Sequence, residues 1–156
     1  MAESQPTQQL IIQRIYLKHS FFEAPNTPHV FQQTQDWKPK VNVELQVNHT
    51  VLTEENHYEV TLRITTRTMM EDSLIHEAKV TQAGVFAIRG FSEEQLRQIL
   101  GSYCPNILFP YVRKNISELV AEGGFPQLLL TPMNFDAMYA EQQRQFEEKR
   151  QAAMVN

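Results

Sequence analysis

Apolar side chains stand at every second position of residues 41–47, with polar residues between them. A period of two is typical of an antiparallel strand with one buried face. The alternation returns over residues 57–68. After a hairpin turn at 70–73, residues 74–90 indicate a further strand, in which Gly84 fits a bulge or bend. These stretches predict three consecutive strands.

The segment from Leu10 to Phe22 predicts an earlier strand, which ends before a loop that contains Pro25 and Pro28. Counted by simple alternation, both faces of this strand are apolar: Ile12, Tyr16 and Phe22 on one, and Ile11, Ile15, Leu17 and Phe21 on the other. Such a strand must be covered on both sides or paired along its edge with another subunit. The first ninety residues are therefore predicted to be all β.

The pattern changes to helical after Phe91. Ser92 and Gln95 form a capping box for a short helix that we expect to stop at Gly101. A second helix is predicted beyond Pro105 and Pro110, over residues 111–122.

Gly123 and Gly124 then end that helix, and a glutamine- and charge-rich helix follows over 136–154. Strands followed by helices predict an α+β fold. We expect a single domain over residues 1–156, with flexible tails at 1–9 and about 148–156.

Composition and charge limit the classes of partner and the cellular compartment that fit this chain. Eighteen acidic against fourteen basic residues give a net charge of −4, which disfavours nucleic acid as a partner. One cysteine cannot close an internal disulfide, so a reducing cytoplasm fits the sequence. No apolar stretch approaches the roughly 18 to 20 residues of a membrane span, and we expect no direct membrane insertion.

The sequence contains few residues in patterns typical of a catalytic or metal site. Cys104 is the single cysteine, and the five histidines show no metal-ligand spacing: His19, His29, His49, His57 and His76. A lone cysteine is most often a small buried hydrophobe, so we expect no enzyme, no metal and no cofactor. A nucleophile activated by a histidine stays open as an alternative.

Aromatic residues are frequent beside prolines, in segments that look irregular: Phe31, Trp37, Tyr103, Phe109, Tyr111, Phe125 and Phe135. They can fold back and complete the core. They can also line an apolar groove, since large exposed apolar patches usually mark binding sites. The pattern alone leaves both interpretations open.

Five segments resemble the SecB family of bacterial protein-export chaperones: "QRIY" at 13–16, "FEAPNTPHVFQ" at 22–32, "GVFAIRG" at 84–90, "GSYCPNILFPYVRKNISELV" at 101–120 and "GGFPQLLLTPMNFDAMY" at 124–139. The resemblance implies a four-stranded antiparallel sheet with helices packed on one face, assembled as a dimer of dimers. It also implies ATP-independent holding of unfolded precursor polypeptides and their delivery to the motor SecA.

The resemblance also suggests two sites. The client groove would use the seven aromatic residues above and Met138. The SecA-binding face would include Glu23 and Glu77, with His19 and Lys79 at positions where acidic residues are expected, so that the acidic face is diluted. A homo-oligomeric scaffold with no client groove is the alternative, in which all the aromatics belong to the core.

Overall fold

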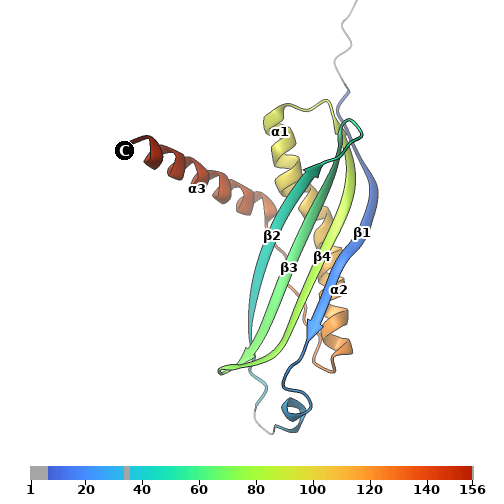
Figure 1. The fold of residues 1–156 in the computed structure, drawn as a ribbon, viewed down its shortest axis with the longest axis vertical. Coiled ribbons are helices and arrows are strands. Elements are labelled where there is room, and N and C mark those ends of the chain that lie inside the picture. Colours follow the sequence, from blue (N-terminus) through green and yellow to red (C-terminus); the bar gives the residue numbers. More distant parts are fainter. Residues whose placement is uncertain (1–6, 34–35, 156) are drawn as a thin grey trace, which may run out of the picture.

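A four-stranded antiparallel sheet forms the body of the molecule (Figure 1). The computed structural model describes residues 7–33 and 36–155. The strands are β1 (Gln9–Glu23), β2 (Lys40–Val51), β3 (His57–Met70) and β4 (Ser73–Arg89), in the order β1-β4-β3-β2. The predicted four-stranded sheet is confirmed.

The hairpins lie close to where the sequence places them. The β3–β4 turn is Glu71 and Asp72, with Glu71 at φ 54°. Strand β2 is longer than predicted, because residues 48–51 still pair with β3, up to Val51 opposite Tyr58. The polar run after Val47 therefore belongs to the strand, and the turn follows it.

Strand β1 departs from simple alternation at two points. Its register against β4 shifts between Ile12 and Arg14 and again between Leu17 and His19. The first bulge places Ile15 opposite Gly84 on the inner face and Tyr16 on the outer one, so the predicted faces are wrong between the bulges, for residues 15–17. The second bulge restores the predicted phase, and Phe22 lies on the inner face and Phe21 on the outer one, as predicted.

Gly84 itself causes no register shift. A Cβ atom there would lie 2.7 Å from the Phe86 ring and 3.3 Å from the Arg14 carbonyl oxygen. The glycine thus permits a close approach of β1 to β4, and the bulges belong to the neighbouring strand.

The predicted capping box is present at the start of α1 (Glu93–Gln98), where Ser92 accepts from the Gln95 amide. However, the helix does not stop at Gly101. It passes through a π turn, η2 (Ile99–Tyr103), directly into α2 (Cys104–Glu122). At Gly101 a Cβ atom would lie 2.6 Å from the Tyr139 ring, so this glycine allows close contact with a later helix and does not end this one.

Both prolines of this region are helical. Pro105 follows the π turn, in which the Cys104 amide donates to the Ile99 carbonyl, and Pro110 lies inside α2. Tyr103, Phe109 and Tyr111 are therefore helical, and the prediction that they lie in irregular segments is wrong. Tertiary packing of the buried side of α2 outweighs the missing amide donor of Pro110.

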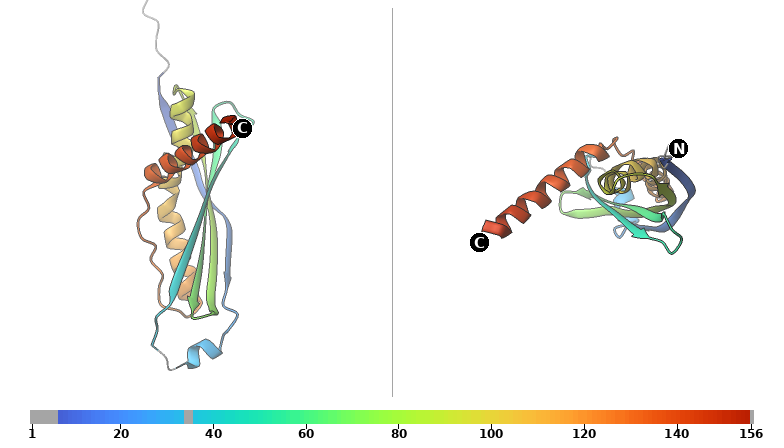
Figure 2. Two further views of the ribbon diagram at one scale, coloured as in Figure 1. Left: turned by 90° about the vertical axis from the view of Figure 1, so that its left-hand side faces the viewer. Right: turned by 90° about the horizontal axis from the view of Figure 1, so that it is seen from above.

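Helix α2 covers the inner face of β4 and β3, which we call the inner sheet face (Figure 2). Five of its side chains have no exposed surface and stand at the spacing of one helical face: Cys104, Leu108, Val112, Ile116 and Val120. The Gly123 amide donates to the Leu119 carbonyl, and Gly124 has φ +87°, which confirms the predicted helix end.

Helix α3 (Phe135–Val155) projects away from the sheet (Figure 1). The prediction that the helices pack on one face is therefore wrong for α3, which contacts η2 at its start. Of the predicted tails, residues 1–6 and 156 lie outside the described residues, Gln9 belongs to β1, and residues 148–155 are helical. Among the described helices, none has the length and apolar character needed to cross a membrane.

Candidate functional site

The inner side of β2 is an open apolar surface. Val41 and Val43 are 37% and 42% exposed, although they lie beside the fully buried β3 residues of the same face. The cause is the position of α2, which packs on β4 and β3 and leaves this part of the edge strand uncovered, whereas Leu45 and Val47 are partly buried against the core. We call Val41, Val43, Leu45 and Val47 the β2 strip. Its strand of 12 residues spans about 40 Å.

A hollow of about 890 Å³ lies at the upper end of the β2 strip. It is bounded by residues 45–49 of β2, by α1 and η2, and by the first turns of α3. Phe135 forms a buried part of its wall, where its ring lies 5.8 Å from the Phe109 ring. Met138 and Phe146 line the hollow from α3 and are solvent-exposed.

Aromatic rings gather at the lower end of the β2 strip, around the buried Phe125. Its ring centroid lies 5.2 Å from Phe31, 6.3 Å from Trp37 and 6.4 Å from Phe22, and 4.8 Å from the imidazole of His76. We call these five residues the lower aromatic cluster. Trp37 stands three positions before Lys40, the first residue of β2, so the cluster leads into the β2 strip.

The structure divides the eight predicted groove residues into two groups. Five are exposed: Phe31, Trp37, Tyr103, Tyr111 and Met138. Three belong to the hydrophobic core: Phe109, Phe125 and Phe135. Phe31 and Trp37 rest on Phe125, and Met138 lies in the hollow beside Phe135. A role of these residues in client binding stays a prediction.

Sequence reasoning missed several exposed apolar residues. The alternation of residues 41–47 indicated a buried face. Nothing in the local sequence indicated that α2 would leave this face half open. Leu129, 57% exposed in the segment after α2, and Phe146 on α3 were also missed. Their spacing resembles that of ordinary core residues, so only the placement of the helices distinguishes them.

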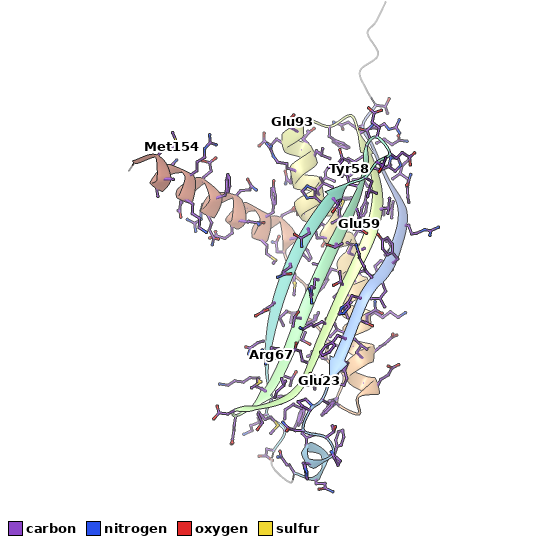
Figure 3. All side chains as sticks on the ribbon, in the orientation of Figure 1. Glu23, Tyr58, Glu59, Arg67, Glu93 and Met154 are labelled. Carbon is purple, nitrogen blue, oxygen red and sulfur yellow. The ribbon has the colours of Figure 1, made fainter. Side chains whose placement is uncertain are left out.

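The four predicted SecA-face residues lie on the side of the sheet away from α2, which we call the outer sheet face. Figure 3 labels one of them, Glu23, near the end of β1. Glu23 is the cross-strand partner of Glu77. The Glu77 carboxylate forms ion pairs with Lys79 Nζ, 3.1 Å from its Oε1, and with Arg67 Nε, 3.5 Å from its Oε2. His19 pairs with Thr81 further along β1. The acidic pair is thus partly neutralised by neighbouring cations.

A second polar group on the outer sheet face ties β1 to β3. The Tyr16 hydroxyl donates to the Glu59 carboxylate, and Lys18 Nζ lies 2.9 Å from Glu59 Oε1. These hydrogen bonds lower the pKa of Glu59, while burial and the carboxylate raise the pKa of Tyr16 to about 12. Tyr16 and Lys18 lie beyond the first bulge of β1, so this contact fixes the shifted register.

Cys104, the first residue of α2, is completely buried in the core. Burial raises the pKa of its thiol to about 12, so the thiolate needed for nucleophilic attack is scarce at neutral pH. In the described part of the chain, no cluster of three potential metal ligands occurs. The geometry therefore favours a packing role for Cys104.

Comparison with known proteins agrees with this architecture. The family model described as preprotein translocase subunit SecB matches residues 3–146. The chain is 50% identical to protein-export protein SecB of Nitrosococcus oceani over 137 residues, covering 88% of this chain and 83% of the relative. Identity to the SecB of Alcanivorax borkumensis is 47% over 136 residues, covering 86% and 85%.

A solved structure shares the fold. The SecB-like chaperone of Mycobacterium tuberculosis, in complex with a ChAD peptide from the HigA1 antitoxin, superposes with a TM-score of 0.66 at 17% identity, over 80% of this chain and 90% of that chain. Because the family model and the curated relatives each match most of the sequence, this chain belongs to the SecB family of protein-export chaperones.

Proposed function

We propose that this protein holds unfolded precursor polypeptides in a translocation-competent state without ATP and delivers them to SecA. The observation that carries the proposal is the β2 strip, which is left open by α2 and joins an aromatic cluster to a hollow lined by both apolar and polar side chains. An extended client segment fits this arrangement. Strand β2 is about 40 Å long, which is the length of about 12 extended client residues.

Weak contacts at several points suffice for holding. Burying about 100 Å² of apolar surface is worth about 2.5 kcal/mol. Clients that contact the β2 strip, the lower aromatic cluster and the hollow together gain from effective concentration. A surface made of valines and flexible apolar side chains is also unselective, which suits unrelated clients.

Client holding is tested by titrating the native protein with a reduced, carboxymethylated unfolded protein, with the folded form of that protein as the control. We expect saturable binding of the unfolded form alone, unchanged by ATP, and suppression of its aggregation. Absence of binding would support the scaffold alternative, in which the apolar surfaces are covered by other copies of the chain.

A homotetramer, built as a dimer of dimers, is part of the proposal. Edge strand β1 leaves large apolar side chains exposed: Ile11, Ile12, Leu17 and Phe21. Pairing of β1 edges between two copies would cover them. Sedimentation at micromolar concentration tests this, and a mass equal to one 18.2 kDa chain would refute it.

SecA is proposed to bind the outer sheet face around Glu23 and Glu77. Support comes from the placement of both carboxylates side by side on an exposed face. Lys79 neutralises part of this charge, so Lys79→Glu should tighten SecA binding at low salt. Unchanged affinity would place the SecA contact elsewhere on the chain.

A further inference from the structure

His76 is a buried histidine at the base of the lower aromatic cluster. It lies on the inner sheet face in β4 and is 2% exposed. Its ring stands 4.8 Å from the Phe125 centroid and 5.8 Å from that of Phe22. Phe125 in turn supports Phe31 and Trp37, so the imidazole is a structural part of the cluster.

The surroundings of His76 suit only a neutral ring. Its Nδ1 atom is buried without a hydrogen-bond partner among the described residues, as is the hydroxyl of Thr68, its cross-strand neighbour. A protonated ring carries two N–H donors and a full charge. Phe22 and Phe125 offer no acceptor for these donors, and the Thr68 hydroxyl carries no charge, so protonation would leave a buried charge without an ionic partner.

Charged groups that could compensate a protonated His76 lie elsewhere. Glu23, Arg67 and Glu77 occupy the outer sheet face, on the opposite side of the strands. The ionisable residues of the elements around the cluster are exposed: His29 in η1, Asp36 and Lys38 beside Trp37, and Glu118 and Glu122 near the end of α2. Burial accordingly lowers the pKa of His76 from its ordinary value of 6.5.

We infer that His76 is an acid-sensitive lock on the lower aromatic cluster: the neutral ring keeps Phe125 packed against Phe31 and Trp37, and the protonated ring releases them. The charged imidazole gains water only if Phe22 or Phe125 moves away. Opening would expose Phe125, which is 6% exposed in the closed cluster. Acid therefore increases the exposed apolar surface at this end of the β2 strip.

The single tryptophan makes the lock directly observable. Trp37 stacks on Phe125 at an interplanar angle of 24°, so its fluorescence reports the state of the cluster. The full chain is titrated from about pH 8 to about pH 4, and tryptophan emission, hydrophobic-dye binding and far-UV circular dichroism are followed. We expect emission to shift to longer wavelength and dye binding to rise, with a midpoint below 6.5 and unchanged secondary structure.

Two variants test whether His76 is the group whose protonation opens the cluster. His76→Phe keeps an aromatic ring without a titratable group, and His76→Gln keeps polarity without one. Both should lose the transition, whereas His29→Gln, a change of an exposed histidine in η1, should retain it. Should His76→Phe fail to fold, the Gln variant and the NMR titration of the His76 ring in the unchanged protein provide the test, since ring and emission must share one midpoint.

Two outcomes would overturn the lock: an emission transition that persists in the His76 variants, or one that coincides with loss of far-UV ellipticity and so reports global unfolding. The test involves no client polypeptide. The lock therefore stands or fails independently of the proposed holding function.

Discussion

Trp37→Ala gives the sharpest test of the client groove, because its effect on binding can be worked out from the structure. Trp37 is 43% exposed. A tryptophan side chain has about 250 Å² of surface, so about 100 Å² is free to contact a client. Its burial against a client is worth at most about 2.5 kcal/mol. Since a flexible client can shift to other contacts, we expect about a tenfold weaker Kd, or about 1.4 kcal/mol.

The same change also affects the fold, and the two effects must be separated. Loss of the stacking contact with Phe125 should lower the free energy of unfolding by about 1 kcal/mol. Client affinity is measured by calorimetry with the carboxymethylated unfolded protein, and stability by urea unfolding. Phe21→Ala is the matched control, since Phe21 is 37% exposed but lies on the outer sheet face. Because Phe21 also belongs to the proposed β1 contact between copies, sedimentation must show that both variants assemble as the unchanged protein does.

A particular result would refute the reasoning about Trp37. If Trp37→Ala binds clients as the unchanged protein does, while unfolding at lower urea, the residue serves the fold alone. Equal weakening by Trp37→Ala and Phe21→Ala would show that client binding does not depend on the inner sheet face. Either outcome would remove the lower aromatic cluster from the proposed groove.

Three further predictions concern single side chains. Glu59→Gln should lower the free energy of unfolding by about 1 to 2 kcal/mol. Because the pKa of Glu59 is lowered in the folded state, this stabilisation is complete above about pH 4.5 and is lost in stronger acid, so urea unfolding of the two proteins should converge there. Cys104→Ser should keep client binding and cost about 1 to 3 kcal/mol of stability; loss of binding in the folded variant would contradict the packing role. Glu23→Lys should weaken SecA binding in a salt-dependent way, and unchanged affinity would exclude the Glu23 side chain from the interface.

The sheet could be predicted from the sequence because each strand carries its own signal. Alternation over 57–68 and the turn at 70–73 are local features, and the structure places β3, β4 and their hairpin there. The faces of β1 could be predicted at its two ends but not between its two bulges. Two bulges shift its register, and a bulge depends on how the neighbouring strand approaches, which is a tertiary property.

In the helical half of the chain, tertiary packing outweighs the local preferences of glycine and proline. Gly101 and Pro110 are normally helix-ending residues, yet the chain is helical through both. Gly101 is needed for the close approach of Tyr139, and Pro110 sits in a helix whose opposite side buries Leu108 and Val112. Both reasons involve residues distant in sequence or in the core, so composition around these positions could not reveal them.

Burial of Phe109, Phe125 and Phe135 bears on how the proposed client surface is held in place. An exposed aromatic side chain tends to collapse onto its own protein unless something supports it. Phe125 supports Phe31 and Trp37, and Phe135, packed against Phe109, supports the start of α3 and hence Met138. The buried rings therefore support the exposed side chains from below and hold them at the surface. A core residue of this kind can matter for client binding without touching a client, because its loss would let the exposed rings fold inward.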